Sequence, residues 1–240
     1  MGKIYQYECK RLLWNHFFFG MAAIFLFYGW QVLQSVTVLG ISHTAPFSAW
    51  SFGDYLSRMI PLLWIGALFF LTFFTSPKAR RAAILTDATP AIPRRYRAAR
   101  CAAALTGIFL LTFAILAEAA LFYGLYFKWY AWGTLALPAL ITLVPSMLFV
   151  LGSGWFLGQF RPWLVYCWMP FPFLCRFLPL PDALGIWNGS FFSEYPLSLG
   201  AVDPAFRLPF SVLLPQCFLL ISGVLLLFFH AGEKTTETGA

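Results

Sequence analysis

The sequence predicts an all-α polytopic membrane protein with six transmembrane helices. Of its 240 residues, 60% are hydrophobic and only 10% are charged, whereas soluble proteins carry about 25% charged residues. The apolar residues form continuous runs, without the alternation expected of a transmembrane β-barrel. This composition excludes a water-soluble enzyme, a disordered chain and a collagen-like chain.

Six apolar runs are close to the roughly 20 residues that a helix needs to cross a bilayer. The predicted spans are residues 17–41, 55–74, 101–127, 134–160, 163–180 and 209–230. The first run is too long for the apolar region of a signal peptide and lacks a convincing cleavage site, so we expect it to be retained.

The distribution of basic residues predicts the orientation. With the N-terminus in the cytoplasm, twelve of the sixteen Lys and Arg residues lie on the cytoplasmic side, and the exceptions are Arg58, Lys128, Arg176 and Arg207. This is the positive-inside pattern. It places both termini in the cytoplasm and explains the net charge of +7 without nucleic acid. We expect a multi-pass protein of the plasma membrane, from a bacterial source.

Residues 1–16 are predicted to form an amphipathic helix at the inner membrane surface. Tyr5, Cys9, Leu12 and Leu13 share one helical stripe, while basic and polar residues occupy another face. Two interpretations remain open. The helix either anchors the first span only, or passes motion from a cytoplasmic partner to the bundle.

The basic loop 76–100 is predicted to contain a short helix. Ser76 is a good N-cap and Pro77 suits the first helical position, whereas Pro90 and Pro93 end the helical pattern. Positive-inside topology alone could explain the charges. A separate capped helix between two spans favours a docking element.

The segment 181–208 precedes the last span and lies outside the cell in the predicted orientation. It contains Trp187, Phe191 and Phe192 but no apolar run long enough to span. A re-entrant or surface-lying hairpin and a plain connecting loop are both compatible with this pattern.

This layout resembles the permease subunit of a type-2 ATP-binding-cassette (ABC) exporter. The resemblance rests on the N-terminal helix, the six spans, the helical first cytoplasmic loop and the long external segment. It implies a coupling helix that docks on the ATPase through Lys78, Arg80, Arg81, Ile84 and Leu85. It also implies that residues 1–16 are the connecting helix, and that the permease forms a homodimer with two copies of an ABC ATPase subunit.

Catalytic and cofactor motifs are not found in the sequence. It has no G-x-x-x-x-G-K-[ST] motif, so ATP and Mg²⁺ are expected on the partner ATPase and the chain itself is not expected to be an enzyme. His16, His43 and His230 are far apart and suggest no metal site.

Three charged residues fall inside the predicted spans: Arg58, Glu118 and Arg176. Such residues need a partner or water. All three are expected near the outer side, where Glu118 could pair with either arginine. They either stabilise helix packing or contribute to an external gate or substrate path, and Gln31 and Gln34 are similarly ambiguous. A single intramembrane acid and no mid-span histidine argue against a membrane-embedded hydrolase.

The resemblance therefore leads us to expect an exporter that works by alternating access. Its aromatic-rich spans favour an apolar or amphipathic cargo, and the first expectation is a peptide such as an antimicrobial or cytolytic peptide. The alternative is a non-transporting immunity or assembly subunit that binds its target through the external segment 181–208.

Overall fold

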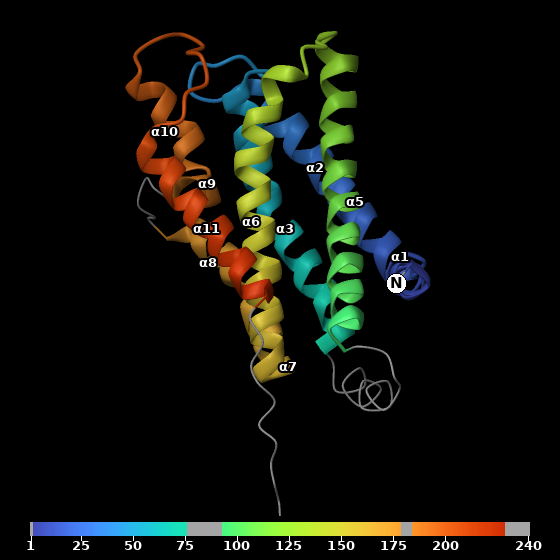
Figure 1. The fold of residues 1–240 in the computed structure, drawn as a ribbon. Coiled ribbons are helices and arrows are strands. Elements are labelled where there is room, and N and C mark those ends of the chain that lie inside the picture. Colours follow the sequence, from blue (N-terminus) through green and yellow to red (C-terminus); the bar gives the residue numbers. More distant parts are fainter. Residues whose placement is uncertain (1, 76–92, 179–183, 229–240) are drawn as a thin grey trace, which may run out of the picture.

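The computed structural model describes residues 2–75, 93–178 and 184–228, and the regular secondary structure of these residues is helical (Figure 1). The elements in chain order are α1 (Gly2–Leu13), α2 (His16–Ser35), η1 (Thr37–Leu39), α3 (Ala49–Thr75), α5 (Pro93–Phe127), α6 (Gly133–Phe160), α7 (Pro162–Trp168), α8 (Phe171–Phe177), α9 (Gly185–Asn188), α10 (Ser190–Ser198) and α11 (Phe210–Phe228).

Five helical segments among the described residues are long and apolar enough to cross a membrane. They are His16–Leu39, Ala49–Thr75, Ala98–Phe127, Gly133–Phe160 and Phe210–Phe228. The chain is therefore a multi-pass membrane protein, as the composition predicts. We call the end of the bundle where α5 meets α6 the upper end, and the end where α3 finishes and α5 starts the lower end (Figure 1).

The predicted fifth span, 163–180, is not one continuous helix in its described part. It consists of α7 and α8, with seven residues each, and the break lies at Met169 and Pro170. Met169 keeps helical backbone angles, but Pro170 and Pro172 have no amide hydrogen to donate, so two helical hydrogen bonds are lost at the break. Since α6 descends and α11 starts again near the upper end (Figure 1), the chain between them returns upward in short pieces.

The helix α3 is at the centre of the bundle. Most of its side chains are buried, including those of Trp50, Tyr55, Trp64 and Phe70, and one stripe that contains Arg58 and Phe69 is partly buried. By contrast, α5 and α11 carry exposed apolar residues along one side, among them Phe109 and Phe218. An exposed apolar face is expected where a helix meets lipid tails, so the packed centre and the lipid-facing rim together fit a membrane bundle.

The N-terminal helix α1 lies across the long helices and is seen nearly end-on in Figure 1. The predicted stripe packs against the bundle: Leu12 is buried, and Tyr5, Cys9 and Leu13 contact the core. Trp14 is 80% exposed, as expected for an interfacial anchor. The helix ends at Leu13, and His16 already begins α2.

Candidate functional site

A polar cavity of about 430 Å³ lies near the upper end of the bundle. Its polar lining comes from the turn after η1 and from α3, α8, α9 and α10, through Ser42, Asp54, Arg58, Arg176, Asn188 and Ser193. Two of these residues, Arg58 and Arg176, are among the intramembrane residues that the sequence singles out. We call this cavity the arginine pocket.

Within the arginine pocket, Arg58 is paired with Asp54. The Arg58 Nε donates to the Asp54 Oδ2 at 2.6 Å, and Asp54 is only 3% exposed. The expected pairing of Glu118 with an arginine is therefore wrong for Arg58. The sequence prediction started the second span at Tyr55, but α3 begins at Ala49 and includes Asp54 in the buried helix.

Arg176 contributes a second guanidinium to the same pocket. It interacts electrostatically with both Arg58 and Asp54. Its Nη1 atom is buried and has no hydrogen-bond partner among the described residues. Two arginines and one carboxylate leave the pocket lining with one uncompensated positive charge.

Two glycines bring α10 against α3. Gly189 has a left-handed φ of 87°, which L side chains rarely adopt, and a Cβ there would lie 2.9 Å from Asp54 Oδ1. Gly53 faces Phe192, whose ring would lie 2.1 Å from an added Cβ. The start of α10 is thereby held at the arginine pocket, where the Asn188 side chain accepts from the Ser190 amide at 2.9 Å.

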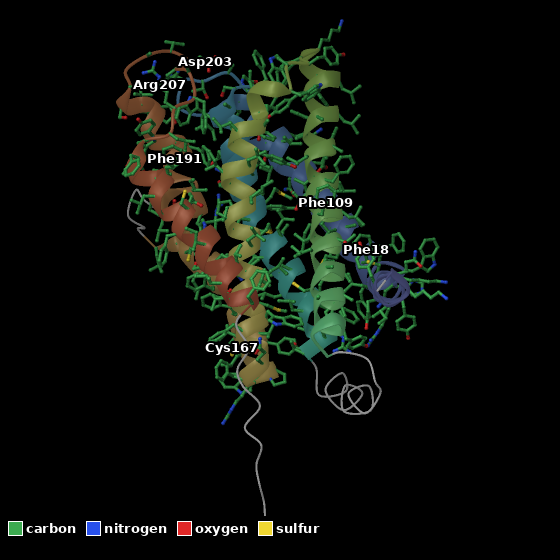
Figure 2. The ribbon with its side chains drawn as sticks, viewed as in Figure 1. Phe18, Phe109, Cys167, Phe191, Asp203 and Arg207 are labelled. Atoms are coloured by element: carbon green, nitrogen blue, oxygen red, sulfur yellow. The ribbon has the colours of Figure 1, made fainter. Side chains whose placement is uncertain are left out.

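The segment after α10 is also hydrogen-bonded to α3. Trp50 Nε1 donates to the Pro204 carbonyl at 2.7 Å. Figure 2 shows Phe191 on α10, with Asp203 and Arg207 above it in the segment that leads to α11. The described part of 181–208 is thus a helical cap built onto the bundle, not a plain connecting loop.

The other predicted gate residues lie elsewhere. Glu118 packs over Gly29 of α2 and forms no ion pair with any described residue. Gln31 and Gln34 are exposed, and the Gln34 amide donates to the Tyr126 hydroxyl at 3.4 Å. Of the five intramembrane polar residues, only Arg58 and Arg176 share a cavity.

A larger, apolar cavity of about 840 Å³ lies between the upper halves of α5 and α6. Aromatic side chains such as Phe113 and Trp132 line it together with small residues, and Phe52 contributes from α3. Phe52 and Asp54 are two positions apart on α3, about 200° around the helix. Therefore α3 separates the apolar cavity from the arginine pocket.

A second polar cluster joins α1 to the start of α5. Glu8 has no exposed surface. Its Oε1 accepts a hydrogen bond from the Tyr96 hydroxyl at 2.9 Å and lies 3.5 Å from the Arg100 Nε. Arg100 also donates to the Tyr96 hydroxyl at 2.9 Å, and Arg11 lies 3.7 Å from the other carboxylate oxygen. We call these four residues the Glu8 cluster.

The other members of this cluster shift the pKa of Tyr96. Burial raises the pKa of its phenol, and the hydrogen bond that the hydroxyl donates to the Glu8 carboxylate raises that pKa further, while Arg100 acts in the opposite direction. The neutral phenol is therefore the form that joins the two helices.

Asp54 and Glu8 are not among the residues that the sequence singles out, yet both have a detectable signal in it. Asp54 and Arg58 have the i,i+4 spacing of a helical ion pair. Glu8 lies three residues after Tyr5 and four before Leu12, within the stripe predicted to be buried. A carboxylate on a buried stripe requires a partner. The premise of a single intramembrane acid is also wrong, because Asp54 is a second one.

The expected coupling-helix residues Lys78, Arg80, Arg81, Ile84 and Leu85 lie outside the described residues. In the part of the chain that is described, no three His, Cys, Asp or Glu side chains gather closely enough to hold a metal ion. Comparisons with protein-family models, curated proteins and solved structures find no match to this chain.

Proposed function

We propose that this chain is the permease subunit of an ATP-driven ABC exporter. In this proposal two copies form the membrane unit, and two copies of a separate ATPase bind ATP and Mg²⁺. Closure of the ATPases switches the permease between inward-facing and outward-facing states. The cargo is apolar or amphipathic, and a peptide is our first candidate.

The observation that carries the proposal is the attachment of α1 to α5 through the Glu8 cluster. The loop predicted to contain the coupling helix leads directly into α5, whose Tyr96 and Arg100 hold Glu8. A displacement of this loop would therefore move α5 and α1 together. A helix that only anchored the first span would not require a buried carboxylate bound to a different span.

The proposed orientation places the lower end in the cytoplasm. Lys10 and Arg11 of α1 and Arg161 between α6 and α7 belong to this end, whereas Lys128 and Arg207 belong to the upper end. The bias of basic residues toward the lower end supports this orientation. The arginine pocket and the apolar cavity then belong to the outer half of the bundle.

The nature of the cargo is suggested by the apolar cavity. Its volume of about 840 Å³ is within the range of small-molecule sites, and its aromatic and aliphatic lining offers few hydrogen-bond partners. A sugar or an ion would lose its hydration without compensation in such a cavity, whereas an apolar side chain or acyl chain would not.

Co-purification with an ATPase tests the proposal. We expect the tagged chain, purified from its native host, to retain an ABC ATPase in detergent. Replacing Ile84 and Leu85 together by glutamate should abolish the association, because charged residues cannot fill an apolar groove. Replacing Trp163 and Tyr166, two exposed residues of α7 at the same end, is the matched control. Failure of the unmodified chain to retain any ATPase would contradict the proposal.

A second candidate is a non-transporting immunity or assembly subunit that binds its target at the upper end. The observation that favours it is the exposure of Leu197, Leu199 and Val202, of which Val202 is 86% exposed. The two candidates differ in one measurement. In reconstituted vesicles a permease should show cargo-stimulated ATP hydrolysis, whereas a target-binding subunit should leave hydrolysis unchanged.

A further inference from the structure

The arginine pocket has more positive charge than its own residues neutralise. Of the described residues, Asp54 is the one acid in the lining of this pocket, and its Oδ2 accepts the hydrogen bond of the Arg58 Nε. Arg176 forms no ion pair with any described residue. A charged group within a membrane bundle is costly unless it has a counterion or water, so this pocket is suited to an additional anion.

The buried nitrogen of Arg176 indicates the chemistry of that anion. Its Nη1 is shielded from solvent and lacks a hydrogen-bond partner among the described residues, which is expensive for a cationic donor. A planar guanidinium matches the oxygens of carboxylates and phosphates in a two-point geometry. Arg176 also lines the open pocket, so an oxyanion bound there would meet the part of this guanidinium that faces the cavity.

The start of α10 adds positive electrostatic potential to the pocket, which favours an anion. Asn188, Gly189, Ser190 and Ser193 line the pocket, so the N-terminus of this nine-residue helix points its positive end toward it. The Asp54 carboxylate already lies against Gly189 and between the helix and Arg58. This environment therefore stabilises a carboxylate that belongs to the chain, and the cavity leaves room for a second oxyanion.

We propose that the arginine pocket binds a singly charged oxyanion group, a phosphate or carboxylate, between Arg58, Arg176 and the start of α10. Its volume of about 430 Å³ accommodates an anionic headgroup or a small free anion. The site requires only this chain, so it does not depend on the proposed ATP-driven export.

Ligand-dependent thermal stability of the purified full chain in an uncharged detergent tests this proposal. The probes are inorganic phosphate, acetate and dihexanoylphosphatidylglycerol, with dihexanoylphosphatidylcholine as the lipid without net charge. Ionic strength is held constant with sodium chloride, because screening alone changes surface electrostatics. A ligand that binds the folded state raises the unfolding midpoint in proportion to its occupancy.

Three variants are compared with the unmodified chain. Arg176→Gln should weaken oxyanion binding by about tenfold, as expected for the loss of a charge-assisted hydrogen bond. Asp54→Asn should strengthen binding, because it removes the competing carboxylate, and it keeps the proposal testable if Arg176→Gln does not fold. Arg207→Gln is the matched control, since Arg207 is exposed and lies above Phe191, in the segment that leads to α11 (Figure 2).

The outcomes separate the two sources of the oxyanion. A shift with phosphate or acetate, lost in Arg176→Gln and kept in Arg207→Gln, supports a site for a free anion. A shift only with phosphatidylglycerol, with the same dependence on Arg176, supports a headgroup site. The proposal is overturned if no probe raises the midpoint, or if the shift is the same in Arg176→Gln and Arg207→Gln.

Discussion

The Tyr96 hydroxyl donates a 2.9 Å hydrogen bond to the Glu8 carboxylate, which links the N-terminal helix α1 to the first turns of α5. Arg100 holds the same carboxylate from one turn further along α5. The joint connects two segments that are 88 residues apart in the sequence. It makes α1 a fixed part of the bundle.

Loss of the Glu8 carboxylate should destabilise the protein strongly. Glu8→Ala leaves Arg100, which is 7% exposed, without its counterion, and breaking a buried ion pair from one side costs about 3–5 kcal/mol. The measurement is the midpoint of thermal unfolding in detergent, followed by tryptophan fluorescence. Glu194→Ala, at an exposed acid on α10, should change the midpoint little. Equal midpoints for the two variants would show that the Glu8 cluster does not hold α1.

The contribution of Tyr96 should depend on pH. Because its pKa is raised in the folded state, the stability it provides is complete below the pKa of an unfolded tyrosine, about 10. That stability is lost as the pH rises through the folded-state value. Tyr96→Phe should therefore be less stable than the unmodified chain at pH 8, by about 1–2 kcal/mol, and the difference should shrink above pH 10. A difference that grows with pH would contradict this assignment.

A methyl group at Gly53 should push α10 away from α3. The added Cβ would lie 2.1 Å from the Phe192 ring, and overpacking of this kind costs about 1–3 kcal/mol. Gly53→Ala should therefore lower the unfolding midpoint, and adding Phe192→Leu should restore part of it. Gly20→Ala is the matched control, because nothing lies within 4 Å of a Cβ there. Destabilisation of Gly20→Ala to the same extent would refute the steric explanation.

Removal of the Trp50 indole donor should loosen the segment that joins α10 to α11. Trp50→Phe keeps an aromatic ring but loses the bond to the Pro204 carbonyl, which is worth about 1 kcal/mol. We expect trypsin to cleave after Arg207 about fivefold faster, with the product identified by mass. Trp14→Phe, at an 80% exposed position, should leave the cleavage rate unchanged. An unchanged rate in Trp50→Phe would mean that other contacts hold this segment.

The membrane-spanning helices were the feature of the fold that the sequence predicted best, from its long apolar runs. Five of the six predicted spans correspond to α2, α3, α5, α6 and α11, because a bilayer requires continuous apolar helices of a minimum length. The fifth predicted span was harder to anticipate. Its composition is apolar throughout, but Pro170 and Pro172 divide the described part into two short helices, and composition alone does not show where a proline is tolerated.

The candidate site was only partly predictable. Arg58 and Arg176 stood out because charges inside apolar runs are rare, but their common cavity depends on how α3 and α8 approach one another. Asp54 was assigned to a loop because the apolar run begins after it. The helix starts earlier, since Trp50 and Gly53 pack against the cap and Phe52 packs against Tyr123 of α5.

Hydrophobicity and charge bias along the chain determined by themselves that this is a multi-pass helical protein with an amphipathic N-terminal helix, because lipid imposes those patterns locally on each segment. Only the tertiary structure decided that Asp54 pairs with Arg58 and that Arg176 lies in the same pocket. It also decided that Glu8 interacts with Tyr96 and Arg100. These partners come from different helices or from a helix start that packing creates. Their distances depend on the close approach of whole helices and not on any local pattern.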